Sequence, residues 1–280
     1  MRIGIGHYYI KKYGMTEGAK RMAEHGYTCL DFPLANTKSE YYELKGEGDL
    51  ERTFLGIKRE LAAHGVSVHQ IHGPWLPLKD VTDEDRAERF EKMTVAMVVA
   101  RHLGAKYMAV HPLLPFGRGR DNPDEVININ RNFYTAVANV GEKLGVYVCL
   151  ENMPFPDFPL STPEQITDFV KEINHRYLKV CLDIGHANLF PSPIGEHIRY
   201  IGKDLLAIIH AHDNYGECDS HNTPYDGTVD WADCMEALYD IGFDGVFNLE
   251  AEPASKTDSP EEAERAELEL AKTAKLLAGY

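Results

Sequence analysis

The chain has 280 residues, 44% hydrophobic and 26% charged, which is ordinary for a soluble globular protein. Its net charge of −15 argues against a protein that binds nucleic acid by neutralising phosphates, because such surfaces need clustered Lys and Arg. We find no apolar run near the roughly 20 residues of a membrane span, and no basic-then-apolar signal peptide. Five cysteines without a C-x-x-C pair predict a reduced, cytoplasmic protein.

Eight short apolar runs alternate with helical segments along the chain. The predicted strands are residues 2–6, 27–32, 66–72, 105–111, 145–151, 178–184, 205–212 and 244–250. The predicted helices lie near residues 16–25, 49–64, 82–103, 123–144, 163–174, 194–202 and 231–241, and after 260. Nearly continuous apolar strands with helices between them indicate a parallel sheet that is covered on both faces.

Eight such units predict an α/β fold, a single (β/α)8 TIM barrel domain over residues 1–280, with its site at the C-terminal strand ends. An open doubly wound sheet is the alternative. Such a sheet usually has G-x-G-x-x-G after its first strand, whereas this strand ends in GIGHYY. The acidic segment SPEEAERAELELAKTAKLLAGY is interpreted as a solvated terminal helix.

One side chain that can bind a metal stands at the C-terminal end of each of six successive predicted strands. These strand-end residues are His72, His111, Glu151, Asp183, His210 and Glu250. In a barrel, those ends meet at one mouth, and a glutamate buried there needs a cation or a proton. We therefore predict a bound divalent metal. Its central ligands, here called the central four, are Glu151, Asp183, His210 and Glu250.

Mixed carboxylate and imidazole ligands favour Mn²⁺ or Zn²⁺, with Co²⁺, Fe²⁺ and Mg²⁺ as alternatives. Residues two positions before a strand-end residue share its strand face, so they are predicted to fill the layer below the mouth. This layer comprises Gln70, Ala109, Cys149, Cys181, Ile208 and Asn248. Gln70 and Asn248 would need hydrogen-bond partners there.

Further side chains are predicted around the mouth. His7, Trp75 and Phe116 lie on mouth loops and are predicted to pack against a substrate. His212 follows the strand that carries His210, so it is predicted to face the substrate or to lie behind the ligands.

Seven segments together resemble the xylose isomerase-like barrel superfamily, which includes sugar isomerases, epimerases and endonuclease IV-type apurinic endonucleases. They are IHGPW, AVHP, LENM, CLDIGHAN, HAHDN, DSHNTPYDGTVDW and NLEAE, in the family's order. The endonuclease-type pattern implies a three-metal cluster. In it, His72, His111 and Glu151 hold one metal, Glu151 bridges to a second held with the rest of the central four, and His186, Asp219 and His221 hold a third.

Two segments resemble the sugar enzymes more closely: DSHNTPYDGTVDW, and LENMP followed by Pro156 and Pro159. The resemblance implies a divalent-metal-dependent isomerase or epimerase that acts on a sugar, a sugar acid or an inosose-type ketone. Glu151 and Glu250 would exchange a proton beside the carbonyl while the enediolate is stabilised. His186 would bind a substrate oxygen unless a third metal recruits it.

Gly216 departs from the ketose 3-epimerases, which carry a substrate-gripping Arg at that position. An apurinic phosphodiesterase and a non-catalytic sugar-binding barrel are the alternative functions. The expected partner is a small-molecule carbohydrate rather than nucleic acid or a membrane, and a homo-oligomer stays open.

Overall fold

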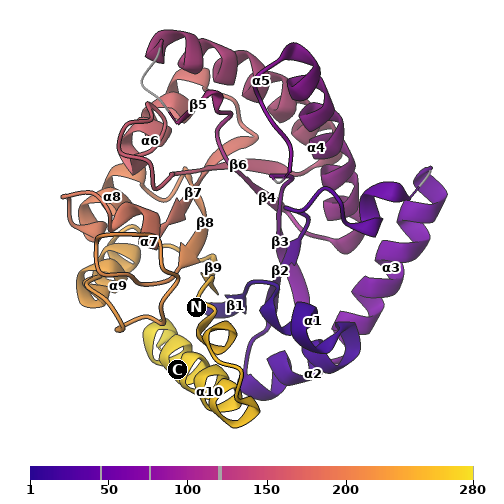
Figure 1. The fold of residues 1–280 in the computed structure, drawn as a ribbon, viewed down its shortest axis with the longest axis vertical. Coiled ribbons are helices and arrows are strands. Elements are labelled where there is room, and N and C mark those ends of the chain that lie inside the picture. Colours follow the sequence, from indigo (N-terminus) through magenta and orange to yellow (C-terminus); the bar gives the residue numbers. More distant parts are fainter. Residues whose placement is uncertain (45, 76, 119–121, 280) are drawn as a thin grey trace.

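The computed structural model describes residues 1–44, 46–75, 77–118 and 122–279. Eight parallel strands close into a barrel in the order β1-β2-β3-β4-β6-β7-β8-β9, with the helices around it (Figure 1). The strands are β1 Arg2–Ile5, β2 Cys29–Pro33, β3 Ser67–His72, β4 Tyr107–Val110, β6 Tyr147–Glu151, β7 Leu178–Asp183, β8 Leu206–Ala211 and β9 Val246–Leu249. The first and last strands pair, Arg2 opposite Val246 and Ile5 opposite Leu249. The predicted TIM barrel is confirmed.

The long helices follow the strands as predicted, and their ends carry recognisable sequence signals. The helices are α1 Tyr8–Tyr13, α2 Met15–His25, α3 Glu47–Ala63, α4 Asp83–Leu103, α5 Pro123–Leu144, α6 Pro163–Ile173, α7 Ile184–Ala187, α8 Ile194–Ile201, α9 Trp231–Asp240 and α10 Pro260–Ala278, with 3-10 turns η1 Glu40–Glu43 and η2 Pro253–Lys256. Thr82 and Thr162 form capping boxes before α4 and α6. Gly104 ends α4 in the left-handed conformation. Within the described residues, no helix combines the length and apolarity that a membrane span requires.

Besides the 3-10 turns η1 and η2, three short elements were not predicted and precede the main helix of a unit: α1, α7 and the strand β5 Pro115–Arg118, which lies outside the barrel. Each follows a barrel strand directly and precedes the main helix of its unit (Figure 1). Segments of four to six residues are too short to show a hydrophobic period, so tertiary contacts decide whether they form. In α1, for example, Tyr8 and Tyr9 are buried in the core.

The predicted layer below the mouth is present inside the barrel. Ala109, Cys149, Cys181 and Ile208 are fully buried and form a cluster of their own. The amide nitrogen of Gln70 has partners, because its Nε2 lies 3.1 Å from Asp31 Oδ2 and 2.9 Å from His210 Nε2. Gln70 Oε1 and Asn248 Nδ2 have no hydrogen-bond partner among the described residues, so the prediction that both side chains are satisfied holds only in part. The barrel interior is therefore a packed support for the residues above it.

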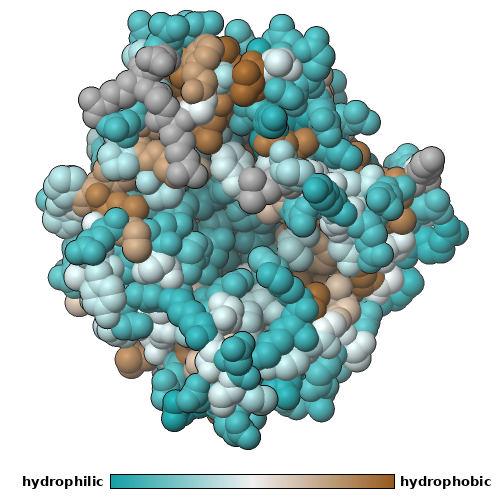
Figure 2. Space-filling model, in the orientation of Figure 1, coloured by the Kyte–Doolittle hydropathy of each residue, from teal (hydrophilic) through white to brown (hydrophobic). Residues whose placement is uncertain are grey.

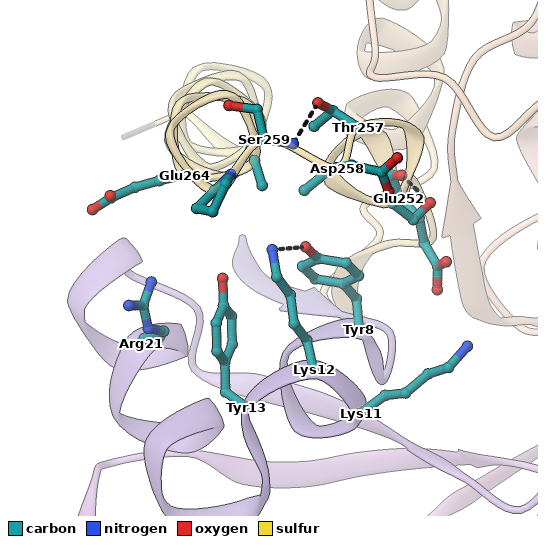
Figure 3. Close-up of a pocket in the computed structure, with 14 residues that line it drawn as sticks. Tyr8, Lys11, Lys12, Tyr13, Arg21, Glu252, Thr257, Asp258, Ser259 and Glu264 are labelled. Carbon is teal, nitrogen blue, oxygen red and sulfur yellow. Dashed lines mark hydrogen bonds between the residues drawn. The ribbon is translucent and has the colours of Figure 1, made fainter.

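The terminal helix forms as predicted with Glu261, Glu262, Glu264 and Glu269 exposed, but one of its carboxylates is buried. Glu267 on α10 is only 2% exposed, and its Oε1 accepts hydrogen bonds from Lys12 Nζ at 3.1 Å and Tyr13 Oη at 2.7 Å. Lys12 and Tyr13 rise from α1 toward α10 (Figure 3). Arg21 Nη1 lies 3.8 Å from the other carboxylate oxygen. A buried carboxylate thus joins the last helix to the first, where the barrel closes.

We expect Glu267→Ala to lower the free energy of unfolding by about 1–3 kcal/mol, because two donors lose a charged acceptor. Urea denaturation followed by circular dichroism measures this loss. The matched control is Glu264→Ala, which removes an exposed carboxylate from the same helix and should change stability by less than about 0.5 kcal/mol. Equal free energies of unfolding for the two variants would contradict the proposed stabilising role of Glu267.

Candidate active site

The C-terminal strand ends place all six strand-end residues at the barrel mouth. Three end β3, β6 and β7, one precedes the end of β8 by a residue, and two directly follow β4 and β9. The central four offer ligand atoms that all lie within 4.8 Å of one another. His72, His111 and Glu151 form another such group. Residues up to 99 positions apart in sequence, Glu151 and Glu250, are therefore brought together as the sequence predicts.

His210 is held in one orientation between two sets of contacts. Its Nδ1 lies 3.0 Å from Glu151 Oε1 and 3.0 Å from Glu250 Oε2. Its Nε2 lies 2.9 Å from the Gln70 amide nitrogen and 3.4 Å from Asp31 Oδ2. Contacts on one ring nitrogen fix the orientation of a metal-binding imidazole, which leaves Nδ1 as the nitrogen that faces the carboxylates.

The mouth concentrates negative charge where little water reaches. Glu151, Asp183 and Glu250 lie together, and the first two are buried. Burial by itself raises the pKa of Glu151, but the neighbouring His210 and His111 outweigh it and hold that pKa well below its usual range. Burial likewise lowers the pKa of His210, yet the surrounding Cys181, Glu250 and Glu151 raise it well above its usual value. This cluster needs positive charge to stay ionised.

The donor set fits a divalent cation. Glu151 Oε2 is buried, lies 3.2 Å from His111 Nε2 and has no hydrogen-bond partner among the described residues. A buried carboxylate oxygen is costly unless positive charge or a ligand meets it. Cys181 also lies within reach of Glu151 and His210, but burial raises the pKa of its thiol well above the usual value, which keeps the sulfur protonated and a poor ligand.

Asp219 contacts the two remaining predicted ligands, His186 and His221. Its Oδ2 lies 3.2 Å from His186 Nε2 and 3.3 Å from His221 Nε2. Asp183 links this group to the central four, because its Oδ1 caps the short helix α7 by accepting the His186 backbone N–H at 2.6 Å. Burial lowers the pKa of His186, but Asp183 and Asp219 outweigh it and raise that pKa to about 10.

Two connected lobes hollow out the mouth. The metal lobe, about 500 Å3, lies over β6 to β8 and includes Glu151, Phe155 and His186 in its wall. The wide lobe, about 910 Å3, lies over β1 to β3 and η2. Both lobes share His72, Trp75, His111, His221 and Glu250 as a common border. Figure 2 shows hydrophilic side chains gathered in the central hollow.

The four side chains predicted to bind a substrate lie in different places. His7 borders the wide lobe, and Trp75 borders both lobes. Phe116 borders neither, because β5 carries it outside the barrel, where it is 42% exposed. The structure thus does not place Phe116 at either lobe, and its contact with a substrate stays a prediction.

His212 also lies away from both lobes. It is fully buried, its Nε2 is 3.0 Å from Asp183 Oδ1, and its ring stacks on His221 with centroids 4.1 Å apart. The chain after β8 forms an antiparallel bridge between Asp213 and Asn222, and this loop turns back beside His212. His212 thus supports a carboxylate of the central four instead of facing a substrate.

Arg89 on α4 is a part of the site that sequence reasoning missed. Its Nη1 donates to the carbonyl of Pro74 at 2.7 Å, and its Nε donates to Asp80 at 2.5 Å. Its guanidinium lies 5.5 Å from the ring centre of Trp75, which packs edge-on against His111 at 4.4 Å. In the sequence DEDRAERFEKM, this arginine has the appearance of any solvated helix residue, so no local signal marks it.

Asp31 was missed as well, although a signal was present. It is a lone carboxylate inside the apolar run CLDF, and a charge buried there requires a partner. The structure supplies Gln70 and His210.

Comparison with known proteins then decides the family. The model of the xylose isomerase-like TIM barrel family matches residues 19–274. The chain belongs to this family. An uncharacterized protein of Methanocaldococcus jannaschii, MJ1311, is 27% identical over 89% of this chain and 83% of its own length. D-psicose 3-epimerase of Ruminiclostridium cellulolyticum is 37% identical over 41% of this chain and 37% of its own length.

Similar proteins also include an inosose isomerase of Bacillus velezensis, 25% identical over 81% of this chain and 79% of its own. Among solved structures, a D-psicose 3-epimerase crystallised with D-fructose superposes with a TM-score of 0.81 at 17% identity, covering all of both chains. An IOLI protein with a bound zinc atom gives a TM-score of 0.74 at 20% identity, covering 99% of this chain and 96% of its own. At these identities, the two structures establish the shared fold.

We expect Arg89→Lys to loosen the segment that carries Trp75. Lysine keeps the charge but cannot reach several acceptors at once, so the emission of Trp75 should shift to longer wavelength as its ring meets more water. Trp231, the other tryptophan, is buried and should emit as before. Fluorescence spectra measure the shift. Arg101→Lys, at an exposed position of the same helix, serves as the control, and identical spectra for both variants would argue against the role of Arg89.

Proposed function

We propose that this protein is a divalent-metal-dependent isomerase or epimerase that acts on a sugar or a related polyol ketone. The observation that carries the proposal is the convergence of the central four, with two glutamates that both contact His210 Nδ1, beside the metal lobe. The family and the inosose isomerase and psicose epimerase relatives support it.

Glu151, Asp183, His210 and Glu250 would hold the metal. Once bound, a divalent ion would supply Lewis-acid stabilisation of the negative charge that develops on substrate oxygens when a proton leaves the adjacent carbon. The zinc-bound IOLI structure supports this choice of cofactor. His72 and His111, which form a second group with Glu151, would accommodate a further ion or bind substrate oxygens.

The two glutamates would carry the proton. Each has one carboxylate oxygen 3.0 Å from His210 Nδ1 and borders the metal lobe, where the substrate would lie. One carboxylate removes the proton next to the carbonyl, and the other returns a proton to the substrate. Return to the opposite face of the same carbon gives an epimer, and return to the neighbouring carbon gives an isomer.

His186 would bind a substrate oxygen in this scheme. Its Nδ1 lies 2.8 Å from the carbonyl oxygen of Asn152 and its Nε2 3.2 Å from Asp219, so the ring is held at the wall of the metal lobe. A substrate oxygen would take the place of Asp219 at Nε2, since Nδ1 already contacts the Asn152 carbonyl oxygen.

We expect native protein to bind at least one Mn²⁺ or Zn²⁺ per chain, and Glu151→Gln to weaken that binding by about tenfold or more because a charged ligand is lost. Isothermal titration calorimetry of chelator-treated protein measures the affinity. Glu252→Gln is the control, since Glu252 borders the wide lobe outside the central four. If the native protein binds no divalent metal in any of these titrations, the proposal is refuted.

We expect the metal-loaded protein to exchange a C–H proton of at least one ketose or inosose for deuterium in D2O. Glu151→Gln should reduce the exchange rate by about 10²–10⁴-fold, the usual contribution of a positioned acid or base. Proton NMR follows the exchange. Because Glu151→Gln also weakens metal binding, it is assayed at saturating metal. Exchange unchanged by the substitution would contradict the role of Glu151.

Nicking of abasic duplex DNA by the same preparation, abolished in Glu151→Gln protein, would favour the phosphodiesterase alternative. The nine residues of the three-metal pattern lie together at this mouth, and this arrangement is the observation that supports the alternative.

A further inference from the structure

We infer that the substrate carries a second ring-sized group beyond the reacting sugar, and that the wide lobe holds this group by its apolar face. The inference rests on the proposed function, because it concerns the substrate of the same site. It names a glycosyl or aryl substituent as the group that distinguishes the substrate from a free monosaccharide.

The wide lobe is the larger of the two lobes. The wide lobe measures about 910 Å3 and the metal lobe about 500 Å3, and Glu250 is the one member of the central four that borders both. Pockets of roughly 300–1,000 Å3 accommodate drug-sized ligands, which exceed a monosaccharide. A monosaccharide that reacts between Glu151 and Glu250 would therefore leave much of the combined space of the two lobes unfilled.

Part of the wall of the wide lobe is apolar. Tyr41, Trp75, Pro33, Pro77 and Ile10 present rings and apolar carbon to the wide lobe. Figure 2 shows hydrophobic side chains in the hollow on the side of β2 and α3, in contrast to the hydrophilic centre. Aromatic faces bury large apolar area against another ring at a small cost in conformational entropy.

Two aromatic rings of this wall are fixed by contacts with neighbouring side chains. Tyr41 packs against Phe32 and Phe54 with ring centres 5.7 Å and 5.2 Å away. Trp75 is held between Arg89 and His111. Rings that are immobilised in this way suit a partner with a flat apolar face.

The rim supplies polar contacts for the edge of such a group. Lys256 Nζ donates to Ser220 O at 2.9 Å and lies 2.5 Å from Asn222 Oδ1, so it is anchored beside the lobe. Lys11 borders the same lobe, and its side chain turns away from Lys12, which donates to Tyr8 (Figure 3). Hydroxyl groups at the edge of a glycosyl ring match these donors, and an aryl group would use only the apolar wall.

The test compares D-fructose with ketoses that carry the same reacting unit and a second ring. Isomaltulose and lactulose provide glycosyl groups, and 6-O-benzyl-D-fructose provides an aryl group. We expect at least one of them to show a kcat/KM for C–H exchange about tenfold or more above that of D-fructose, and tighter binding in calorimetry of metal-loaded protein. A preference for the disaccharides identifies a glycosyl group, and a preference for the benzyl ether identifies an aryl group.

Ala35→Trp should fill the wide lobe, because Ala35 borders it and is only partly exposed. This variant should lose the preference for the two-ring ketoses and keep exchange of D-fructose. Asn36→Trp, at an exposed position of the same wall, gives a second filling variant in case the first fails to fold. Ala87→Trp, exposed on α4, is the matched control.

The outcomes separate the inference from the proposed function. The inference is overturned, while the isomerase function stands, if D-fructose exchanges its proton as fast as every two-ring ketose. It is also overturned if Ala35→Trp lowers the exchange rate of all substrates equally. Absence of exchange with any ketose or inosose would overturn the proposed function. Preferential binding of a two-ring ketose that Ala35→Trp abolishes would still support the inference in that case.

Discussion

Carboxylates buried next to one another constrain this structure more than any other feature. Glu151, Asp183 and Glu250 meet at the barrel mouth, where their mutual repulsion and lost hydration must be offset by positive charge. His210, oriented by Gln70 and Asp31 below, turns Nδ1 toward two of these carboxylates. The buried layer inside the barrel therefore serves the mouth, because it fixes the imidazole around which the carboxylates assemble.

If the proposed function and the further inference hold, chemistry and recognition use different strands of the same barrel. β6 to β9 supply the central four, while the loops after β1, β2 and β3 supply the rings of the wide lobe. Trp75 borders both lobes and touches His111, so it is the physical contact between the two halves. Arg89 couples the position of Trp75 to helix α4 through buried hydrogen bonds. The shape of the cavity consequently depends on residues that touch neither metal nor substrate.

Local sequence signals account for the barrel and its strand-end residues, but not for side chains whose role depends on distant partners. Strands with a period of two place Glu151 and Cys149 on one face, so the ligand layer and the layer below it follow from spacing. Glu267 gives the opposite lesson. In an acidic helix it resembles its solvated neighbours, and only the arrival of Lys12 and Tyr13 from α1 makes it a buried anchor.

The sequence by itself determined the strand order, the closed barrel and the six residues that converge at its mouth, because alternation of apolar runs and helices leaves few topologies and strand ends share one edge. The tertiary structure decided which loop side chains reach that mouth. It turned Phe116 outward on β5, buried His212 behind Asp183 and opened a lobe over β1 to β3. Loops carry no hydrophobic period, so their side chains are placed by packing against parts of the chain far away in sequence.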